Sequence, residues 1–397
     1  MLTSVKTIAE KLRKKKYATH IVGKWHLGFC KPDYLPTHRG FQHHYGFWGG
    51  AEDYYTHQVR KAFDFRDDAK VRRDATGVYS TTLFQTRARQ IIAKHNQSRP
   101  LFLFLPFQSV HEPLQVPTRF DTYHKKVADK NRATFLGMVT AMDHAVGQIK
   151  RSLRKHGMLK NTLIIFLSDN GAAPQNSGSN WPLRGGKHTL FEGGTRVPAF
   201  VWGLGLKPRV ESRIFHITDW YPTILGLVDP LDQDLDLDGV NQWNALKNIS
   251  APWPRNSMIY NIDDITKSKP EPISAIRVDD WKFIWKESGA WNGWYFPPEQ
   301  KMSSHSRDAW DGLLYRHTGY FPSRNSTGKK RQNVYNMLFD LSSDPSEKHN
   351  LASKYPEKVE ELKAKLLKAA KTTQKVKSSR YERTGASRNG VWTTGWC

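Results

Sequence analysis

Short apolar runs alternate with helical patterns over the first part of the chain. Runs rich in β-branched and aromatic residues, each closed by Gly, Pro or Asp, predict strands at residues 18–22, 101–107, 162–168 and 197–202. Apolar residues at helical spacing predict helices at residues 78–95, at 131–156 and from 218 to about 228. Strands that alternate with helices predict an α/β fold with a mainly parallel sheet that helices cover on both faces.

The pattern changes after residue 230. An acidic loop with regularly spaced leucines occupies residues 229–239 and predicts a boundary between domains at 1–230 and 231–397. Two apolar runs separated by Asp279-Asp280 predict an antiparallel hairpin, and residues 337–341 predict a further strand. Residues 355–372 predict an amphipathic helix. The second domain is therefore expected to be a small α+β domain, with irregular surface at residues 287–330.

Composition narrows the classes of partner. The chain of 397 residues carries 61 Lys+Arg against 37 Asp+Glu, a net charge of +24, which favours polyanions such as acidic polysaccharide. No helix-turn-helix or zinc-finger pattern accompanies the charge, so nucleic acid is not expected as a partner. No apolar run has the length of a membrane span, and residues 1–12, which lack a continuous apolar centre, are not expected to act as a signal peptide.

The cysteine count and three glycosylation sequons give information about the cellular compartment of the protein. The two cysteines, Cys30 and Cys397, exclude a disulfide scaffold, and they can pair only if they lie close together in the fold. Sequons at Asn96, Asn248 and Asn325 are compatible with a secretory route.

Lys24 and His26 form the first candidate site. They stand two residues apart directly after the first predicted strand, so both side chains point to one side of an extended segment. A cation and a proton-transferring group at a strand end suit acid–base chemistry at an anionic centre. The alternative is a turn with a solvated lysine and a structural histidine.

Polar groups follow two further predicted strands. Asp169 and Asn170 come after the strand at 162–168 and offer hard oxygen ligands that suit Ca²⁺ or Mg²⁺, although two residues do not complete such a site. The alternative for this pair is a capping turn before Gly171. His111 follows the strand at 101–107. In an α/β sheet, ligands bind at the carboxyl ends of the strands, which is where all of these residues are predicted to lie.

A glycine-rich segment at residues 180–198 is the fourth candidate. Glycines allow backbone and the lysine of this segment, Lys187, to approach an oxyanion closely. The segment lacks the spacing of a phosphate-binding P-loop. Its alternative interpretation is an ordinary surface loop.

In this order, the motifs resemble those of the sulfatase family, and more closely the group of arylsulfatases B, I and J. The resemblance spans nearly the whole chain and rests on GKWHLG at 23–28, LPTHRGF at 35–41, EDYY at 52–55, QSVHEPLQVP at 108–117, SDNG at 168–171, NWPLRG at 180–185, LFDL at 338–341 and GVW at 390–392. It implies an alkaline-phosphatase-like fold with a smaller C-terminal α+β domain.

The resemblance also implies roles for the candidate residues. Lys24 and His26 would contact the sulfate and the family's catalytic formylglycine, and His111 would bind sulfate and protonate the leaving oxygen. Lys187 would contact the sulfate. Asp169 and Asn170 would bind calcium. The implied substrate is a sulfate ester of a glycosaminoglycan sugar, and the implied location is lysosomal or secreted.

The chain departs from the family at the nucleophile. The family makes formylglycine from the cysteine of a C-x-P-S-R motif that precedes GKWHLG, together with an upstream Asp-Asp pair that completes the calcium site. Neither cysteine of this chain stands in such a motif, and Cys30-Lys31-Pro32 is a chance match on the wrong side of GKWHLG. We therefore expect an N-terminally truncated form of the enzyme, inactive as written and with an incomplete calcium site.

Two other functions stay open from the sequence. A natural pseudo-sulfatase would bind sulfated polysaccharide through its basic surface without cleaving it. A phosphoryl-transfer enzyme of the same fold is the weaker alternative, because its extra Asp and His metal ligands are not evident. An in-frame C-x-P-S-R exon upstream of Met1 would favour the sulfatase over the pseudo-sulfatase.

Overall fold

The computed structural model describes residues 3–230, 237–263, 272–287, 292–297, 334–373 and 387–396. The chain forms two compact units. The first comprises Met1–Thr162, Val228–Asp232 and Ser378–Cys397, and the second comprises Leu163–Leu227 and Gln233–Lys377.

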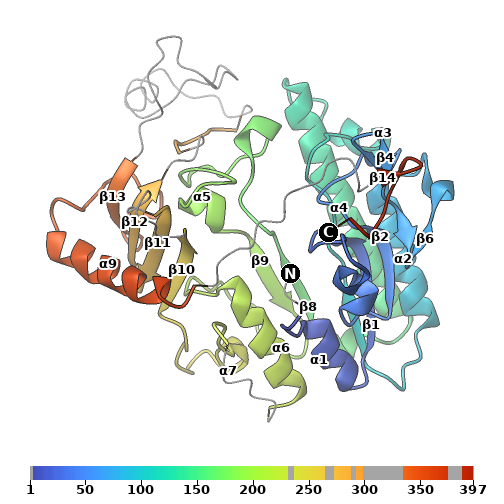
Figure 1. Ribbon diagram of the computed structural model, residues 1–397, viewed down its shortest axis with the longest axis horizontal. Coiled ribbons are helices and arrows are strands. Elements are labelled where there is room, and N and C mark those ends of the chain that lie inside the picture. Colours follow the sequence, from blue (N-terminus) through green and yellow to red (C-terminus); the bar gives the residue numbers. More distant parts are fainter. Residues whose placement is uncertain are drawn as a thin grey trace. The chain divides into compact units, whose positions relative to one another are not determined.

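The first unit is built on a five-stranded mixed sheet with the strand order β6-β5-β2-β1-β7 (Figure 1). β1 (Ala18–Lys24) lies between β2 (His43–Phe47) and β7 (Leu101–Phe104) and is parallel to both. The antiparallel strands β5 (Arg66–Asp67) and β6 (Lys70–Val71) extend the sheet at one edge. The strands predicted at residues 18–22 and 101–107 are thereby confirmed.

Helices cover both faces of this sheet because neighbouring residues of β1 point to opposite sides. Val22 packs in a core with Phe84 of α2 (Ser80–Lys94), whereas Ile21 packs in another core with Ala9 of α1 (Ile8–Lys14). The long helix α4 (Lys130–Lys155) packs against α2. A short helix, α3 (Thr118–Asp121), precedes α4.

A second, small sheet joins the chain's last described residues to the first unit. Its order is β14-β15-β4-β3, formed by β14 (Ser387–Arg388), β15 (Val391–Trp392), β4 (Ala62–Phe63) and β3 (Gln58–Val59). β15 is parallel to β4. The backbone N–H of Gly395 donates to the carbonyl of Cys30 at 2.6 Å. Cys30 is disulfide-bonded, and the other cysteine, Cys397, lies outside the described residues.

The second unit begins with an antiparallel pair, β8 (Ile164–Leu167) and β9 (Ala199–Trp202). Both strands were predicted, and their antiparallel pairing is an exception to the mainly parallel arrangement expected from the sequence. A parallel connection needs a long crossover, usually a helix. The described segment between them contains only short helical turns such as α5 (Glu192–Thr195).

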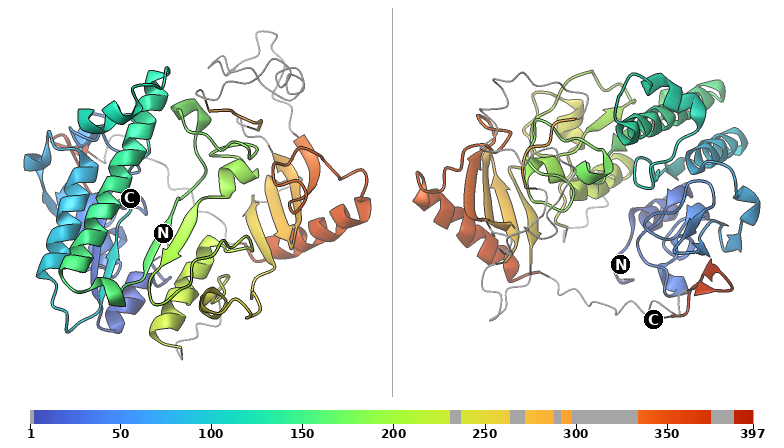
Figure 2. Two further views of the ribbon diagram at one scale, coloured as in Figure 1. Left: turned by 180° about the vertical axis from the view of Figure 1, so that it is seen from behind. Right: turned by 90° about the horizontal axis from the view of Figure 1, so that it is seen from above.

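A four-stranded antiparallel sheet and a helix complete the second unit, as predicted. The sheet has the order β10-β11-β12-β13, formed by β10 (Ser257–Ile262), β11 (Ser274–Val278), β12 (Trp281–Glu287) and β13 (Val334–Asp340). α9 (Pro356–Ala370) lies along one face of this sheet (Figure 2). On that face, Leu362 of α9 packs against Phe283 of β12. On the other face, Leu190 and Phe191 of the glycine-rich segment pack against Ile284.

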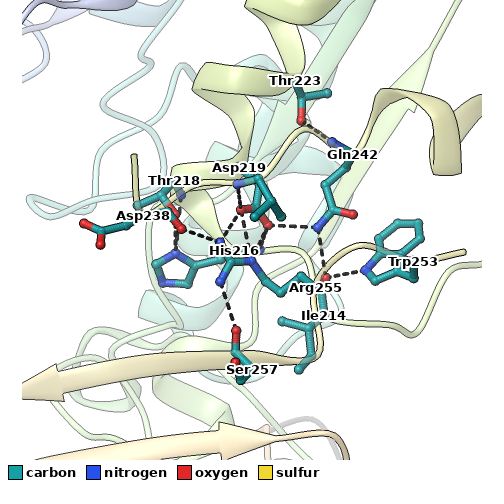
Figure 3. A network of polar contacts seen from close by, with 11 residues as sticks. Ile214, His216, Thr218, Asp219, Thr223, Asp238, Gln242, Trp253, Arg255 and Ser257 are labelled. Carbon is teal, nitrogen blue, oxygen red and sulfur yellow. Dashed lines mark hydrogen bonds and ion pairs between the residues drawn. The ribbon is translucent and has the colours of Figure 1, made fainter. Parts of the chain in front are cut away.

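A buried ion pair ties together the irregular parts of the second unit (Figure 3). Asp219 is fully buried and accepts from Arg255, with a shortest nitrogen–oxygen distance of 2.6 Å. Its carboxylate also accepts from Gln242 Nε2 at 3.0 Å and from the Val240 backbone N–H at 2.9 Å. These contacts join the start of α6 (Trp220–Val228) to the segment before β10 and to α7 (Trp243–Lys247). Burial of this aspartate is therefore balanced by charge and hydrogen bonds.

The compact units are divided differently from the domains predicted at 1–230 and 231–397. Leu163–Leu227 belongs to the second unit, and Ser378–Cys397 belongs to the first. Most of the irregular surface predicted at 287–330 lies outside the described residues. Among the helices that the structure describes, none combines the length and apolar character needed to cross a membrane.

Candidate functional site

Lys24 and His26 lie at the carboxyl edge of the parallel strands, as predicted. The backbone N–H of Lys24 donates to Pro106 O at 2.9 Å, beyond the end of β7. The N–H of His26 donates to Trp48 O at 3.1 Å, beyond the end of β2. Trp25, between them, is buried, whereas His26 is exposed. β1 ends at Lys24, and His26 has a φ of +55°, so a turn after the strand places His26 at this edge while the Trp25 indole enters the core.

Gly23 allows β1 to approach the segment after β7. A Cβ atom at this position would stand 2.2 Å from Pro106 O, and the backbone φ is +133°. The Lys24–Pro106 hydrogen bond therefore depends on a residue without a side chain.

Gly23→Ala is expected to lower the free energy of unfolding of the first unit by about 2–4 kcal/mol, because the clash adds to the strain of the positive φ. Urea denaturation measures the loss. Gly157→Ala is the matched control, since Gly157 also has a positive φ of +73° but a Cβ there would meet nothing within 4 Å. A loss at Gly23 no larger than at Gly157 would contradict the role of close approach.

His111 follows β7 and is held by the EDYY segment. Gln108 clamps Glu52: its Oε1 accepts from the Glu52 backbone N–H at 2.9 Å, and its Nε2 donates to Glu52 O at 2.6 Å. The Tyr54 hydroxyl donates to His111 O at 2.9 Å. His111 Nδ1 lies 2.8 Å from the Glu112 carbonyl, which only accepts, so Nδ1 carries a proton. In the neutral ring, Nε2 is then the nitrogen that can take up a proton.

A buried acid–base cluster lies behind this segment, and the sequence did not predict it. Glu52 Oε1 lies 3.0 Å from His57 Nδ1 and accepts from Ser80 Oγ at 2.9 Å. His57 Nε2 lies 3.0 Å from Ala75 O. Burial raises the pKa of Glu52 to about 7, although the hydrogen bond from His57 opposes the rise. Glu52 belongs to the EDYY motif identified in the sequence, but the residues that contact its carboxyl group are known only from the fold.

Glu52→Gln is expected to change how stability depends on pH. The carboxyl has a pKa of about 7 in the fold and an ordinary value of 4.5, so folding favours its protonated form. Its contribution to stability is full below about pH 4.5 and is lost as the pH rises to 7, by roughly 3 kcal/mol. Glutamine cannot ionise, so the variant should gain about that much relative to the wild type between pH 5 and pH 7.5. Unfolding midpoints at both pH values test this, and a constant difference would contradict it.

In the second unit, the segments of Asp169, Asn170 and Lys187 lie together. The backbone N–H of Lys187 donates to Ala172 O at 3.0 Å. Asn180 closes the same loop, because its Oδ1 accepts from the Ala172 N–H at 2.7 Å and its Nδ2 donates to Gly185 O at 3.1 Å. The predicted acid–amide pair and the predicted sulfate-contacting lysine are thus brought to one place.

The glycines of the glycine-rich segment serve close backbone packing. A Cβ at Gly171 would stand 1.8 Å from Gly193 O, and one at Gly193 would stand 2.4 Å from Arg184 O. The Gly171 N–H donates to Gly194 O at 2.9 Å. These glycines hold the Asp169–Asn170 turn against the loop that carries Lys187.

Buried charges anchor this segment to the antiparallel sheet. Lys282 of β12 lies 2.9 Å from Glu192 Oε1 and 2.8 Å from Glu347 Oε1, and all three side chains are almost completely buried. The Tyr260 hydroxyl also donates to Glu192 at 2.9 Å. Burial raises the pKa of Glu347 to about 7, whereas the Lys282 ammonium helps to hold the pKa of Glu192 below its usual value against burial. One ammonium therefore lies between two carboxyl groups that the fold removes from water, and it balances the charge of one of them.

The calcium site is not complete among the described residues. Groups of three or more His, Cys, Asp or Glu side chains suited to a metal are absent from the part of the chain that the structure describes. Asp169 and Asn170 supply at most three side-chain oxygens, whereas Ca²⁺ takes six to eight ligands. The residues present fit part of a calcium site only.

The predicted site residues divide between the two units. Lys24, His26 and His111 belong to the first unit, and Asp169, Asn170 and Lys187 belong to the second. Each group is assembled within its own unit as described above. The predicted convergence of Lys24, His26, His111 and Lys187 on one sulfate stays a prediction.

Known proteins match both parts of the chain. Residues 2–230 match the family described as "Sulfatase", and residues 254–397 match the "C-terminal region of aryl-sulfatase". Arylsulfatase J of Mus musculus is 36% identical over 393 residues, covering 94% of this chain and 63% of that protein. N-acetylgalactosamine-6-sulfatase of Mus musculus is 30% identical over 249 residues, covering 58% of this chain and 46% of that protein. The chain thus spans about half to two thirds of these relatives.

The architecture also has solved counterparts. The crystal structure named Ps i-CgsB has a TM-score of 0.73 and 25% identity, covering 94% of this chain and 76% of that chain. The alkaline-phosphatase-like fold and the C-terminal antiparallel domain that the motifs implied are confirmed. With family matches over both parts and motifs at the expected strand ends, the chain belongs to the sulfatase family.

Proposed function

We propose that this chain is the substrate-binding part of a sulfuric ester hydrolase that acts on a sulfated amino sugar. The observation that carries the proposal is the parallel order β2-β1-β7, which puts Lys24, His26 and the His111 segment at one sheet edge. Membership of the sulfatase family supports the reaction class, and the name of N-acetylgalactosamine-6-sulfatase supports the class of sugar.

The proposed roles follow from the chemistry of each side chain. The ammonium groups of Lys24 and Lys187 neutralise sulfuryl oxygens, as cations do for transferring oxyanions. His111 gives a proton to the leaving sugar oxygen through Nε2, because Nδ1 is engaged by the Glu112 carbonyl. His26 assists at the sulfate from the segment that directly follows β1.

The family mechanism also needs two groups that the residues discussed so far do not supply, a formylglycine and a calcium ion. Formylglycine would supply the nucleophile, and neither Cys30 nor Cys397 stands in the C-x-P-S-R motif that is its source. Calcium would neutralise the sulfate, with Asp169 and Asn170 as two of its ligands. We also propose a lysosomal or secreted location, which the disulfide at Cys30 supports because such bonds persist in oxidising compartments.

Titration calorimetry with inorganic sulfate and with N-acetylgalactosamine 6-sulfate tests the proposal. Lys24→Ala and Lys187→Ala are each expected to weaken binding about tenfold or more, because each removes a charge-assisted contact. Lys207→Ala is the matched control, since it removes an exposed lysine of the second unit. Binding should also weaken as ionic strength rises. Equal losses in all three variants would reduce the effect to net charge and contradict the proposed site.

A further inference from the structure

A pocket of about 190 Å³ opens in the first unit, and one of its lining residues, Gly50, lies against His26. Its lining includes Phe29, Gly49, Gly50, Arg60, Asp64 and Trp392. All of these residues belong to the same compact unit. Neither the resemblance to sulfatases nor the proposed roles assigned any of them a function.

The pocket adjoins His26 through Gly50. A Cβ at Gly50 would stand 2.7 Å from His26 Nε2, so the imidazole lies directly over the glycine backbone. Gly49 lies next to Asp64, because its N–H donates to Asp64 Oδ2 at 2.8 Å. Because Gly49 and Gly50 have no side chains, a ligand in the pocket can approach their backbone closely.

Aromatic side chains form a fixed wall of the pocket. Phe29 and Trp392 pack edge to face with ring centroids 6.1 Å apart. The Trp392 indole N–H donates to Val59 O at 3.1 Å, and Arg66 donates to Trp392 O. Hydrogen bonds to its indole and to its carbonyl therefore fix Trp392, which favours a preformed site over one that closes on its ligand.

Arg60 supplies the cation at the rim. It is exposed and forms the two-residue turn between β3 and β4 together with Lys61, with φ angles of +49° and +66°. This turn ordinarily prefers Asn-Gly, so the turn itself does not call for arginine. Within the described part of the chain, Arg60 makes no ion pair or hydrogen bond, whereas Asp64 is already paired with Arg66 at 2.8 Å.

We propose that this pocket binds the acidic sugar next to the sulfated sugar of the substrate, with its carboxylate on Arg60. This inference rests on the proposed function, and it implies that the substrate contains at least two sugar units. The volume suits one ring, since it lies below the roughly 300–1,000 Å³ of pockets for larger ligands. An apolar wall, an accessible glycine backbone and one guanidinium fit a pyranose ring with a planar carboxylate, which arginine binds through two hydrogen bonds.

The test compares Arg60→Gln with Lys61→Gln. Both variants remove one positive charge from the same exposed turn, but only Arg60 lines the pocket. Binding is measured by calorimetry for three probes: inorganic sulfate, a disaccharide of uronate and 6-sulfated N-acetylgalactosamine, and the same disaccharide without sulfate.

Arg60→Gln is expected to weaken binding of both disaccharides about tenfold and to leave inorganic sulfate unchanged, while Lys61→Gln changes none of the three. Equal losses of disaccharide affinity in both variants, or no loss of affinity in Arg60→Gln, would overturn the proposed role of the pocket. If the wild type fails to bind inorganic sulfate, the proposed function fails, and the unsulfated disaccharide still decides the pocket because it needs no sulfate site. Failure of the wild type to bind the unsulfated disaccharide also overturns the pocket.

Discussion

The 397-residue chain on its own is expected to hydrolyse aryl sulfates no faster than its inactivated variants. Neither of its cysteines, Cys30 and Cys397, stands in a C-x-P-S-R motif that yields the formylglycine nucleophile. Loss of a nucleophile in a comparable hydrolase lowers kcat by roughly a millionfold. A chromogenic aryl sulfate assay on the purified chain measures the rate.

The reference for this assay is the double variant Lys24→Ala, His111→Ala. It removes one proposed sulfate contact and the proposed proton donor, so it sets the background. Turnover by the unaltered chain clearly above that background would show that another residue acts as nucleophile.

Lys282→Met is expected to lower the free energy of unfolding of the second unit by about 3–5 kcal/mol. The substitution leaves Glu192 and Glu347 buried with no ammonium between them, and an uncompensated buried charge costs about that much. Methionine keeps much of the length of the side chain, so the loss reports charge more than volume. Urea denaturation measures it.

Lys286→Met is the matched control for Lys282→Met, because both lysines lie on β12 but Lys286 is only half-buried. Its substitution should cost less than about 1 kcal/mol, as for other partly solvated charged groups. Adding Glu192→Gln and Glu347→Gln to Lys282→Met should recover part of the stability. No recovery would mean that packing around Lys282, not charge, stabilises the sheet.

The sequence predicted most elements because their signals are local. The helix predicted at 131–156 is α4 (Lys130–Lys155), with Asp129 capping its start through a hydrogen bond to the Arg132 N–H. The hairpin across Asp279-Asp280 is β11–β12, whose register pairs Val278 with Trp281. Periodicity, caps and short turns involve neighbours in sequence, so they can be recognised without the fold.

Pairing between distant segments could not be predicted in the same way. β15 pairs with β4 through a single residue pair, Val391 and Phe63, and two-residue strands carry no periodic signal. The antiparallel direction of β9 relative to β8 could not be predicted either, because short apolar runs do not by themselves specify the direction of pairing.

The candidate site shows the same division. Lys24, His26 and His111 were predicted because each follows a recognisable strand or motif. Glu52 and Arg60 were not, because their roles depend on what surrounds them. The pKa of Glu52 is raised to about 7 mainly by its burial in the fold, and Arg60 reaches a pocket only through the β3–β4 turn.

The pairing of β15 with β4 has a consequence for folding during synthesis. Domains generally fold as units while the chain leaves the ribosome, with N-terminal ones first. Here the partner of β4 and the Trp392 wall of the pocket are translated after every strand of the second unit. The first unit can therefore begin to fold before the second unit is synthesised, but it can complete its fold only after the second unit has been synthesised. Until β15 emerges, the nascent chain exposes the unpaired edge of β4 and the ring of Phe29, which packs against Trp392 in the folded unit, to chaperones.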